Sequence, residues 1–382
     1  MKERLLEFFS TVFIIGLSWH VSMNYNIVVF APLFILLIFF MKNPFPINIK
    51  YFYITLAFIF VFVFWSLLNI TIYDKVNLEV TDKFIRKAIF GVIIMGFVFL
   101  FYGKKIDLLK KSIDYALWTI LLLWLMQLVV FYATGEYIDL LQPFAGAERA
   151  QRYQAYFIQA VLPIDFIRPT SIYIEPGTYA VNTFPLMVLS YLNHNKITRL
   201  HKGLLISYFL SLSLFAIVIA TLFIFAVELS KFKFKLNKKN VMLVFIIVLI
   251  VSGIVFYIQY RFIDQGGTEQ LGYRELIINH WLALGSYDTL FGLGNGQVVF
   301  DGSTPALIED VSFLFKLTFE FGIFALPYLA ILIYISRGLP LIFLFIILLS
   351  KIHYQIYIMW FYPAALFMIW HTERRNKVQY QE

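Results

Sequence analysis

Two polar segments combine arginine, acidic residues and glycine in patterns suited to chemistry on an anion. In the first segment, Arg168 and Pro169 precede Glu175, Pro176 and Gly177. The planar guanidinium of arginine holds two phosphate oxygens at once, so Arg168 is a candidate anion ligand. Glu175 comes directly before a predicted helix start, where a carboxylate also interacts favourably with the helix dipole. Glu175 is therefore a candidate for either a catalytic or a structural role.

The second segment reads YRELIINHWLALGSYDTLFGLGNG from residue 273. At helical spacing Arg274, Trp281 and Leu284 share one face, which predicts an amphipathic helix on the bilayer surface. Arg274 there binds a substrate anion or reaches lipid headgroups. His280 is a candidate base or anion-binding group, and equally a helix surface residue. The glycine run lacks the Lys-Ser/Thr of a P-loop, which favours a turn over a phosphate cradle.

A third segment places the acids Glu309 and Asp310 directly before a long apolar run. Either carboxylate can take a proton from an attacking hydroxyl group, and Asp310 can instead cap the following helix. Lys316 and Glu320 lie inside the apolar run at helical spacing, which predicts a buried ion pair. No residues have the spacing of a metal site, so we expect neither a metal ion nor a cofactor.

The composition indicates a membrane protein. Of the 382 residues, 61% are hydrophobic and 14% are charged, whereas soluble domains average about 45–50% and about 25%. The absence of cysteine excludes a disulfide scaffold, and the 43 Phe and 24 Tyr exclude disorder. The net charge of +8 does not indicate nucleic-acid binding, because the basic residues cluster in short connections between apolar runs.

Apolar runs long enough to cross a bilayer recur along the whole chain. Crossing takes about 20 residues, and the backbone must be helical because lipid offers it no hydrogen-bond partner. The sequence predicts an all-α polytopic membrane protein of about 11–12 transmembrane helices, near residues 5–22, 25–41, 51–72, 88–103, 115–133, 178–193, 204–229, 240–258, 311–335, 338–350 and 356–371.

The basic residues predict the orientation of these helices. Lysine and arginine cluster on the cytoplasmic side of membrane proteins. Clusters at 196–202 and 231–239 flank the apolar run 204–229, so both are cytoplasmic only if this run is a hairpin or re-entrant segment. The alternative is a single span. With the hairpin, both termini are cytoplasmic, the long loops 134–177 and 259–307 lie outside, and residues 1–382 form a single membrane domain.

The three polar segments resemble those of the Wzy-type O-antigen polymerases and, more distantly, the O-antigen ligases. The similar residues are Arg168 with Glu175-Pro176-Gly177, Arg274 followed eleven positions later by Gly285 with Trp281 and GLGNG, and FEFGIFALPYL from residue 319. Elsewhere the resemblance extends only to the layout of 11–12 helices and two large periplasmic loops.

The resemblance implies a glycosyltransferase with a GT-C-like fold in the bacterial inner membrane. Such an enzyme transfers a growing glycan from undecaprenyl pyrophosphate to the non-reducing end of a second lipid-linked repeat unit, at the periplasmic face. Membrane lipid and a chain-length regulator protein are the other partners implied. Transfer is expected to be metal-independent and to invert the anomeric carbon.

Within that reaction, cations beside the pyrophosphate stabilise its departure. Arg168 and Arg274 are the first candidates, followed by Arg261. The acceptor hydroxyl needs a base. The ligases have a histidine where this chain has Glu309 and Asp310, so the base is open: Asp310 is preferred, followed by Glu309, and then by Glu175 or His280. Loop residues such as Tyr153, Tyr156, Gln151 and Gln154 are candidates for contacting the sugar.

Two alternatives stay open. An O-antigen ligase shares these segments apart from the histidine, and uses a different acceptor. A lipid-linked oligosaccharide flippase or other transporter explains the many helices and the Lys316–Glu320 pair, but predicts inverted repeats that the sequence does not show.

Overall fold

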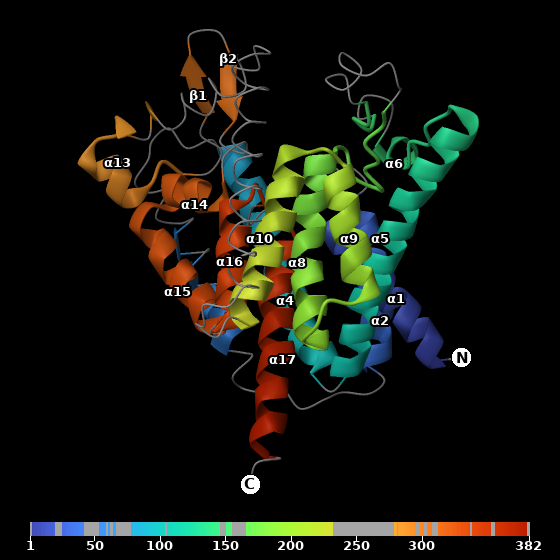
Figure 1. Ribbon diagram of the computed structural model, residues 1–382. Coiled ribbons are helices and arrows are strands. Elements are labelled where there is room, and N and C mark those ends of the chain that lie inside the picture. The colour runs from blue at the N-terminus through green and yellow to red at the C-terminus, as the bar shows by residue number, and fades with distance from the viewer. Residues whose placement is uncertain are drawn as a thin grey trace, which may run out of the picture. The chain divides into compact units, whose positions relative to one another are not determined.

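A computed structural model describes residues 2–19, 25–41, 53–58, 60–61, 64–65, 78–103, 105–145, 150–154, 166–231, 279–280, 282–294, 298–301, 304–307, 312–336, 338–352 and 356–379. In this part of the chain the protein is predominantly helical, as predicted, with one short β-hairpin (Figure 1). The predicted run 240–258 lies outside the described residues.

Three of the described helices are long and apolar enough to cross a membrane: Ile85–Tyr102, Ile106–Thr134 and Phe313–Ile335. This finding supports the prediction of a membrane protein. The number of 11–12 spans, the single membrane domain, the GT-C-like arrangement and the orientation stay predictions.

The described elements form two compact units. The first comprises Met1–Ile59, Lys87–Ile217 and Tyr354–Glu382, and the second comprises Phe60–Arg86 and Val218–His353. The first unit contains α1 (Lys2–Ser18), α2 (Tyr25–Met41), most of α4 (Leu78–Tyr102), α5 (Ile106–Thr134), α6 (Gln142–Ala145), α8 (Pro176–His194), α9 (Arg199–Leu210) and α17 (Ile358–Gln379).

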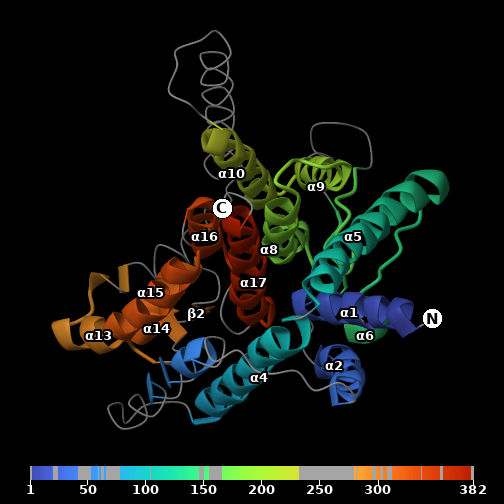
Figure 2. The same cartoon turned by 90° about the horizontal axis from the view of Figure 1, so that it is seen from below.

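Helix α8 is the centre of the first unit. It lies between α17 and α9 and also packs against α5 (Figure 2). Every residue of α8 from Tyr179 to Leu192 is buried, which explains why its sequence is apolar on all sides. Glycine permits close packing around it: a Cβ at Gly91 of α4 would lie 2.3 Å from the Trp360 ring of α17.

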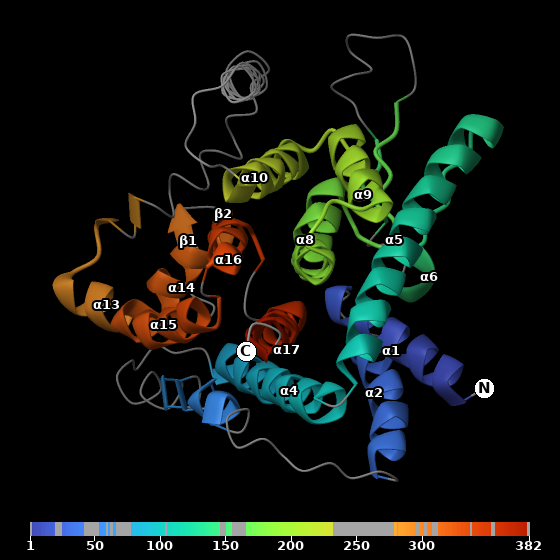
Figure 3. The same ribbon diagram turned by 60° about the horizontal axis from the view of Figure 1, so that its bottom comes forward.

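The second unit contains most of α10 (Leu214–Lys231), with α13 (Ser286–Phe291), β1 (Val298–Asp301), β2 (Thr304–Leu307), α14 (Phe313–Phe321), the 3₁₀ turn η4 (Gly322–Phe324), α15 (Ala325–Ile335) and α16 (Leu339–Leu349). Helix α14 continues through η4 into α15, and α13 packs on η4 (Figure 3). The strands pair antiparallel, with Val298 opposite Leu307 and Asp301 opposite Thr304.

The apolar run 204–229 is divided between two helices. Helix α9 ends at Leu210 and α10 begins at Leu214. Between them Leu212 has a φ of 49°, a left-handed conformation that interrupts an α-helix. The structure thus provides the break that a hairpin or re-entrant segment requires, and the path of such a segment across the membrane stays a prediction.

Candidate functional site

Within the predicted loop 134–177, residues 150–154 run antiparallel to residues 166–174. The Arg152 N–H donates to the Ile174 carbonyl, and the Arg168 N–H donates to the Tyr153 carbonyl, both at 2.7 Å. This pairing brings two arginines, separated by sixteen residues in the sequence, to neighbouring positions at the base of the loop.

Arg168 is held in a defined orientation. Its Nε and Nη2 both donate to the carbonyl of Gln154, at 3.0 and 2.6 Å, and the residue is half-buried. The next residue, Pro169, is buried and has a restricted φ. The guanidinium is therefore fixed at the base of the loop instead of extending freely into solvent.

Glu175 lies beside a second cation. Helix α8 begins at Pro176, as the sequence predicts, and Glu175 occupies the N-cap position. Its Oε2 is 3.7 Å from Nη1 of Arg152, and its Oε1 accepts a hydrogen bond of 3.3 Å from the Thr178 hydroxyl. The Glu175 side chain is 41% exposed, so a substrate hydroxyl can reach the carboxylate. Sequence reasoning missed Arg152, which has no feature that distinguishes it from other basic residues.

Arg168, Arg152 and Glu175 together form what we name the loop-base cluster. Two guanidinium groups can bind phosphate oxygens, and an accessible carboxylate can accept a proton. The cluster therefore has the groups needed for transfer from a phosphate leaving group.

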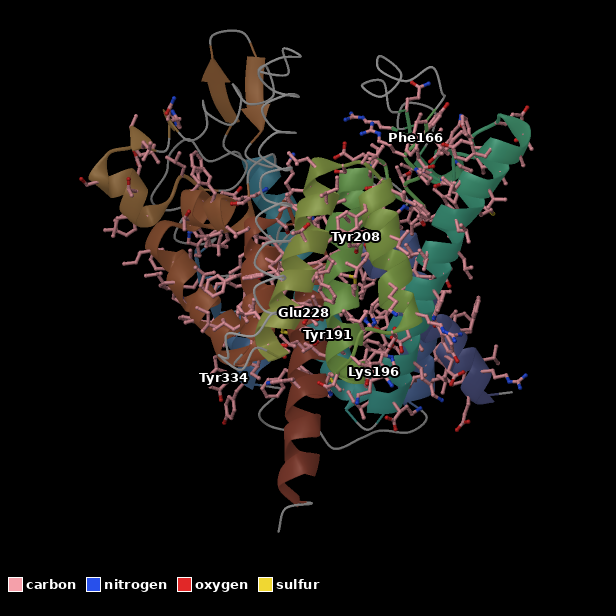
Figure 4. All side chains as sticks on the ribbon, viewed as in Figure 1. Phe166, Tyr191, Lys196, Tyr208, Glu228 and Tyr334 are labelled. Carbon is pink, nitrogen blue, oxygen red and sulfur yellow. The ribbon has the colours of Figure 1, made fainter. Side chains whose placement is uncertain are left out.

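Figure 4 shows at which end of the first unit the loop lies. Phe166, two residues before Arg168, is at one end and Lys196 is at the other, with Tyr208 and Tyr191 between them.

Two of the candidate sugar contacts have structural roles. Gln151 is 4% exposed, and its side-chain amide bonds to other loop groups. The Tyr153 ring stacks on the Tyr137 ring with centroids 3.8 Å apart. The backbone carbonyl of Gln154 accepts hydrogen bonds from the Arg168 side chain. Tyr156 lies outside the described residues. Burial makes the proposed sugar contact of Gln151 wrong.

The structure describes only some of the candidate residues in the second and third polar segments. Arg274, Arg261, Glu309 and Asp310 lie outside the described residues. His280 is exposed, with its ring 6.3 Å from that of Phe319 in α14.

The helix that follows Asp310 begins at Phe313, with Ser312 at its N-cap. The Ser312 hydroxyl accepts from the Phe315 N–H at 3.4 Å. The cap is thus two residues later than the interpretation of Asp310 as a cap requires, so that interpretation is wrong.

The glycine run is a packed turn. The N–H groups of Leu293 and Gly294 donate to the carbonyls of Phe319 and Glu320, at 2.9 and 3.1 Å. Gly292 has a φ of 78°, and a Cβ there would lie 2.3 Å from the Glu320 oxygen. Only glycine permits this conformation and this approach. Because these two N–H groups are already bonded, the alternative of a phosphate cradle at 292–294 is wrong.

The predicted ion pair in α14 is present. Nζ of Lys316 lies 4.0 Å from Oε1 of Glu320, and the two side chains are 3% and 1% exposed. The pair lies inside Phe313–Ile335, one of the helices able to cross a membrane.

Hydroxyl groups pair along the interior of the first unit. The pairs are Ser18–Tyr173 at 2.8 Å, Tyr179–Ser207 at 2.7 Å and Thr183–Tyr208 at 2.6 Å. The first pair links α1 to the inner end of the loop, and the other two link α8 to α9. Because each hydroxyl of these three pairs has a partner, we interpret this row as support for the helices.

A second polar group joins α5, α8 and α9. Asp114 accepts from the Ser190 hydroxyl at 2.5 Å and lies 2.7 Å from Nε2 of His194. Nδ1 of His201 is 2.7 Å from the Thr198 hydroxyl at the start of α9. Burial lowers the pKa of His201 to about 4; the Asp114 charge opposes this change, and His194 adds to it. His201 is therefore neutral at pH 7.

In the residues that the structure describes, no group of three or more His, Asp, Glu or Cys side chains is placed to hold a metal ion. No protein-family model, curated protein or solved structure matches the chain.

Proposed function

We propose that this protein is a surface-polysaccharide polymerase of the Wzy type. It transfers a growing glycan from undecaprenyl pyrophosphate to the non-reducing end of a lipid-linked repeat unit, at the periplasmic face of the bacterial inner membrane. The loop-base cluster is the observation that carries this proposal, because it places two cations and a reachable carboxylate at one end of apolar helices.

The two ends of the first unit indicate which side of the membrane the loop-base cluster faces. The basic connection at 196–202 is expected on the cytoplasmic side by the positive-inside rule. The loop carrying Arg168 is at the other end of these helices (Figure 4). A periplasmic loop-base cluster is the arrangement that a polymerase needs.

The acceptor hydroxyl oxygen attacks the anomeric carbon, and the bond from that carbon to the pyrophosphate oxygen breaks. The electron pair stays on the pyrophosphate, whose growing charge is stabilised by Arg168 and Arg152. Arg274 and Arg261 stay candidates for the same role. The hydroxyl proton passes to a carboxylate. Asp310 or Glu309 is preferred as the base, and Glu175 has the accessibility to serve instead.

The main competing function is a lipid-linked oligosaccharide transporter. The observation that favours it is the buried Lys316–Glu320 pair, because ionisable residues inside membrane helices often mark ion or substrate pathways. A ligase would use the same loop-base cluster with a different acceptor, and only the product separates it from a polymerase.

The test is complementation of a deletion strain, with surface polysaccharide separated on a gel. Wild type should restore the ladder, and Arg168→Ala should lower polymer yield about 10²-fold, as expected for loss of one transition-state donor. Arg168→Lys keeps the charge but loses the fork that grips the Gln154 carbonyl, so its cation is less well positioned and an intermediate yield is expected.

The matched control is Thr119→Ala, because among the described residues the Thr119 hydroxyl bonds to the Tyr115 carbonyl of its own helix. A full ladder from well-expressed Arg168→Ala contradicts the proposed site, and an intact ladder in the deletion strain contradicts the polymerase. Lipid-linked polymer that accumulates without reaching the surface indicates a ligase.

A further inference from the structure

A buried glutamine of α5 bonds to the turn that follows Arg168. The Gln127 Oε1 accepts from the backbone N–H groups of Thr170 and Ser171, at 3.1 and 2.8 Å. Its Nε2 lies 3.1 Å from the Ser171 carbonyl and 3.0 Å from the Ile138 carbonyl. One side chain of a membrane helix thus contacts both the beginning and the end of the loop.

A second glutamine completes this contact from within the loop. Nε2 of Gln151 donates to the carbonyls of Ser171 and Tyr173, at 2.6 and 2.9 Å. Its Oε1 lies 2.8 Å from Nε2 of Gln127 and also accepts from the Tyr137 hydroxyl at 3.2 Å. We name Gln127 and Gln151 the amide pair.

The amide pair holds a turn that the backbone alone does not favour. Ser171 has a φ of 56°, which is unfavourable for residues with a side chain. Its hydroxyl also donates to the Ile120 carbonyl of α5, at 2.8 Å. A left-handed serine therefore persists here because its N–H, carbonyl and hydroxyl groups are all bonded to α5 or to the amide pair.

Gln127 is fully buried in an apolar helix, where an amide is costly unless its groups are bonded. Leucine or alanine would serve the helix itself at least as well. The polar side chain is therefore explained by the loop it binds. The turn that Gln127 holds begins two residues after Arg168. Pro169 lies between them, and because its φ is fixed, the position of the turn also sets the position of the Arg168 backbone.

We infer that the amide pair is a positioning device for Arg168, which sets its guanidinium where the leaving pyrophosphate departs. This inference rests on the proposed function. Gln127 and Gln151 touch neither substrate nor reacting atoms; they act through the turn at Thr170 and Ser171.

The first test measures the loop without using activity. Since the chain has no cysteine, Phe166→Cys provides a single reporter two residues before Arg168. Its labelling rate with a membrane-impermeant maleimide should rise severalfold when Gln127→Ala is added, and should not change with Thr119→Ala. Gln151→Ala should produce a similar rise, and the double variant Gln127→Ala/Gln151→Ala should add little, because both act on one turn.

The second test distinguishes positioning from general support of the fold. In Gln127→Glu the ionised carboxylate faces the Ser171 and Ile138 carbonyls and the Gln151 oxygen, whereas the protonated acid donates to one of them. Polymer yield from Gln127→Glu cells should therefore be at least about threefold higher at external pH 6 than at pH 8, relative to wild type. The amount of folded protein in the membrane is measured at both pH values: positioning predicts that yield falls at pH 8 while this amount is unchanged, whereas general support of the fold predicts that both fall together.

Unchanged labelling in Gln127→Ala, or a Gln127→Glu yield that follows wild type at both pH values, overturns the inference. If Gln127→Ala fails to accumulate, the same labelling comparison with Gln151→Ala decides, because that residue lies outside the membrane helices. Faster labelling combined with a full ladder from Arg168→Ala contradicts the proposed function instead, and shows that the amide pair holds a loop with another role.

Discussion

Replacing Glu320 by leucine is expected to destabilise the helix that carries the buried ion pair. The side chains of Lys316 and Glu320 are 3% and 1% exposed, and the charged atoms are 4.0 Å apart. Removing one partner of a buried pair typically costs about 3–5 kcal/mol, because the remaining charge loses its counter-ion in a medium of low dielectric constant. At about 1.2 °C per kcal/mol for a chain of 382 residues, Tm should fall by about 4–6 °C.

The double variant Lys316→Met/Glu320→Leu removes both charges and keeps similar volumes. Its Tm should equal or exceed the wild-type value, since apolar replacement of a buried pair is often neutral or stabilising. The assay is thermal unfolding of the purified protein in detergent, followed by tryptophan fluorescence. Thr318→Ala is the matched control, because within the described part of the chain the Thr318 hydroxyl bonds to carbonyls of its own helix.

A Tm for Glu320→Leu equal to that of Thr318→Ala would refute the reasoning from burial. The double variant also separates the two candidate functions. A stable double variant that still makes polymer shows that the pair is structural, as a polymerase predicts. A stable double variant that makes none supports ion coupling, and with it the transporter.

Three further predictions concern packing, pH and orientation. Gly292→Ala should cost about 2–4 kcal/mol, because the left-handed φ and the clash with a backbone oxygen add, whereas Gly285→Ala, with open space around its Cβ, should change Tm little. Because the pKa of His201 is lowered to about 4, the unfolded chain binds a proton more readily than the folded chain. The free energy of unfolding should therefore fall by about 2 kcal/mol between pH 7 and pH 5 in wild type, and by less in His201→Asn. An equal fall in both proteins rejects this cause. In intact cells an impermeant maleimide should label Phe166→Cys and not Lys196→Cys, and the reverse result would invert the proposed orientation.

Local patterns in the sequence were sufficient for the features that depend on neighbouring residues. Apolar runs predict helices because lipid and a protein core both require apolar side chains and internally bonded backbone. The start of α8 at Pro176 follows from Glu-Pro-Gly, and the Lys316–Glu320 pair follows from a spacing of four residues. These features are set within one or two helical turns.

The contacts that build the site join residues far apart in the sequence, and no local sequence pattern predicts them. Gln127 and Gln151 are 24 residues apart, and neither residue type has a distinctive spacing. Arg152 approaches Glu175 only because the two stretches of the loop pair antiparallel. The missing Lys-Ser/Thr favours a turn at the glycine run, but the packing of Gly292 on α14 becomes visible only in the structure.

The central claim is that this chain polymerises lipid-linked repeat units, with Arg168 stabilising the departing pyrophosphate. The most direct test uses purified protein in lipid nanodiscs and single-repeat lipid-linked substrate extracted from the deletion strain. We predict a ladder of longer glycans with release of undecaprenyl pyrophosphate, abolished by Arg168→Ala and retained by Thr119→Ala. A folded wild-type protein that leaves the single-repeat substrate unchanged, or an Arg168→Ala variant that elongates it at the wild-type rate, would contradict the claim.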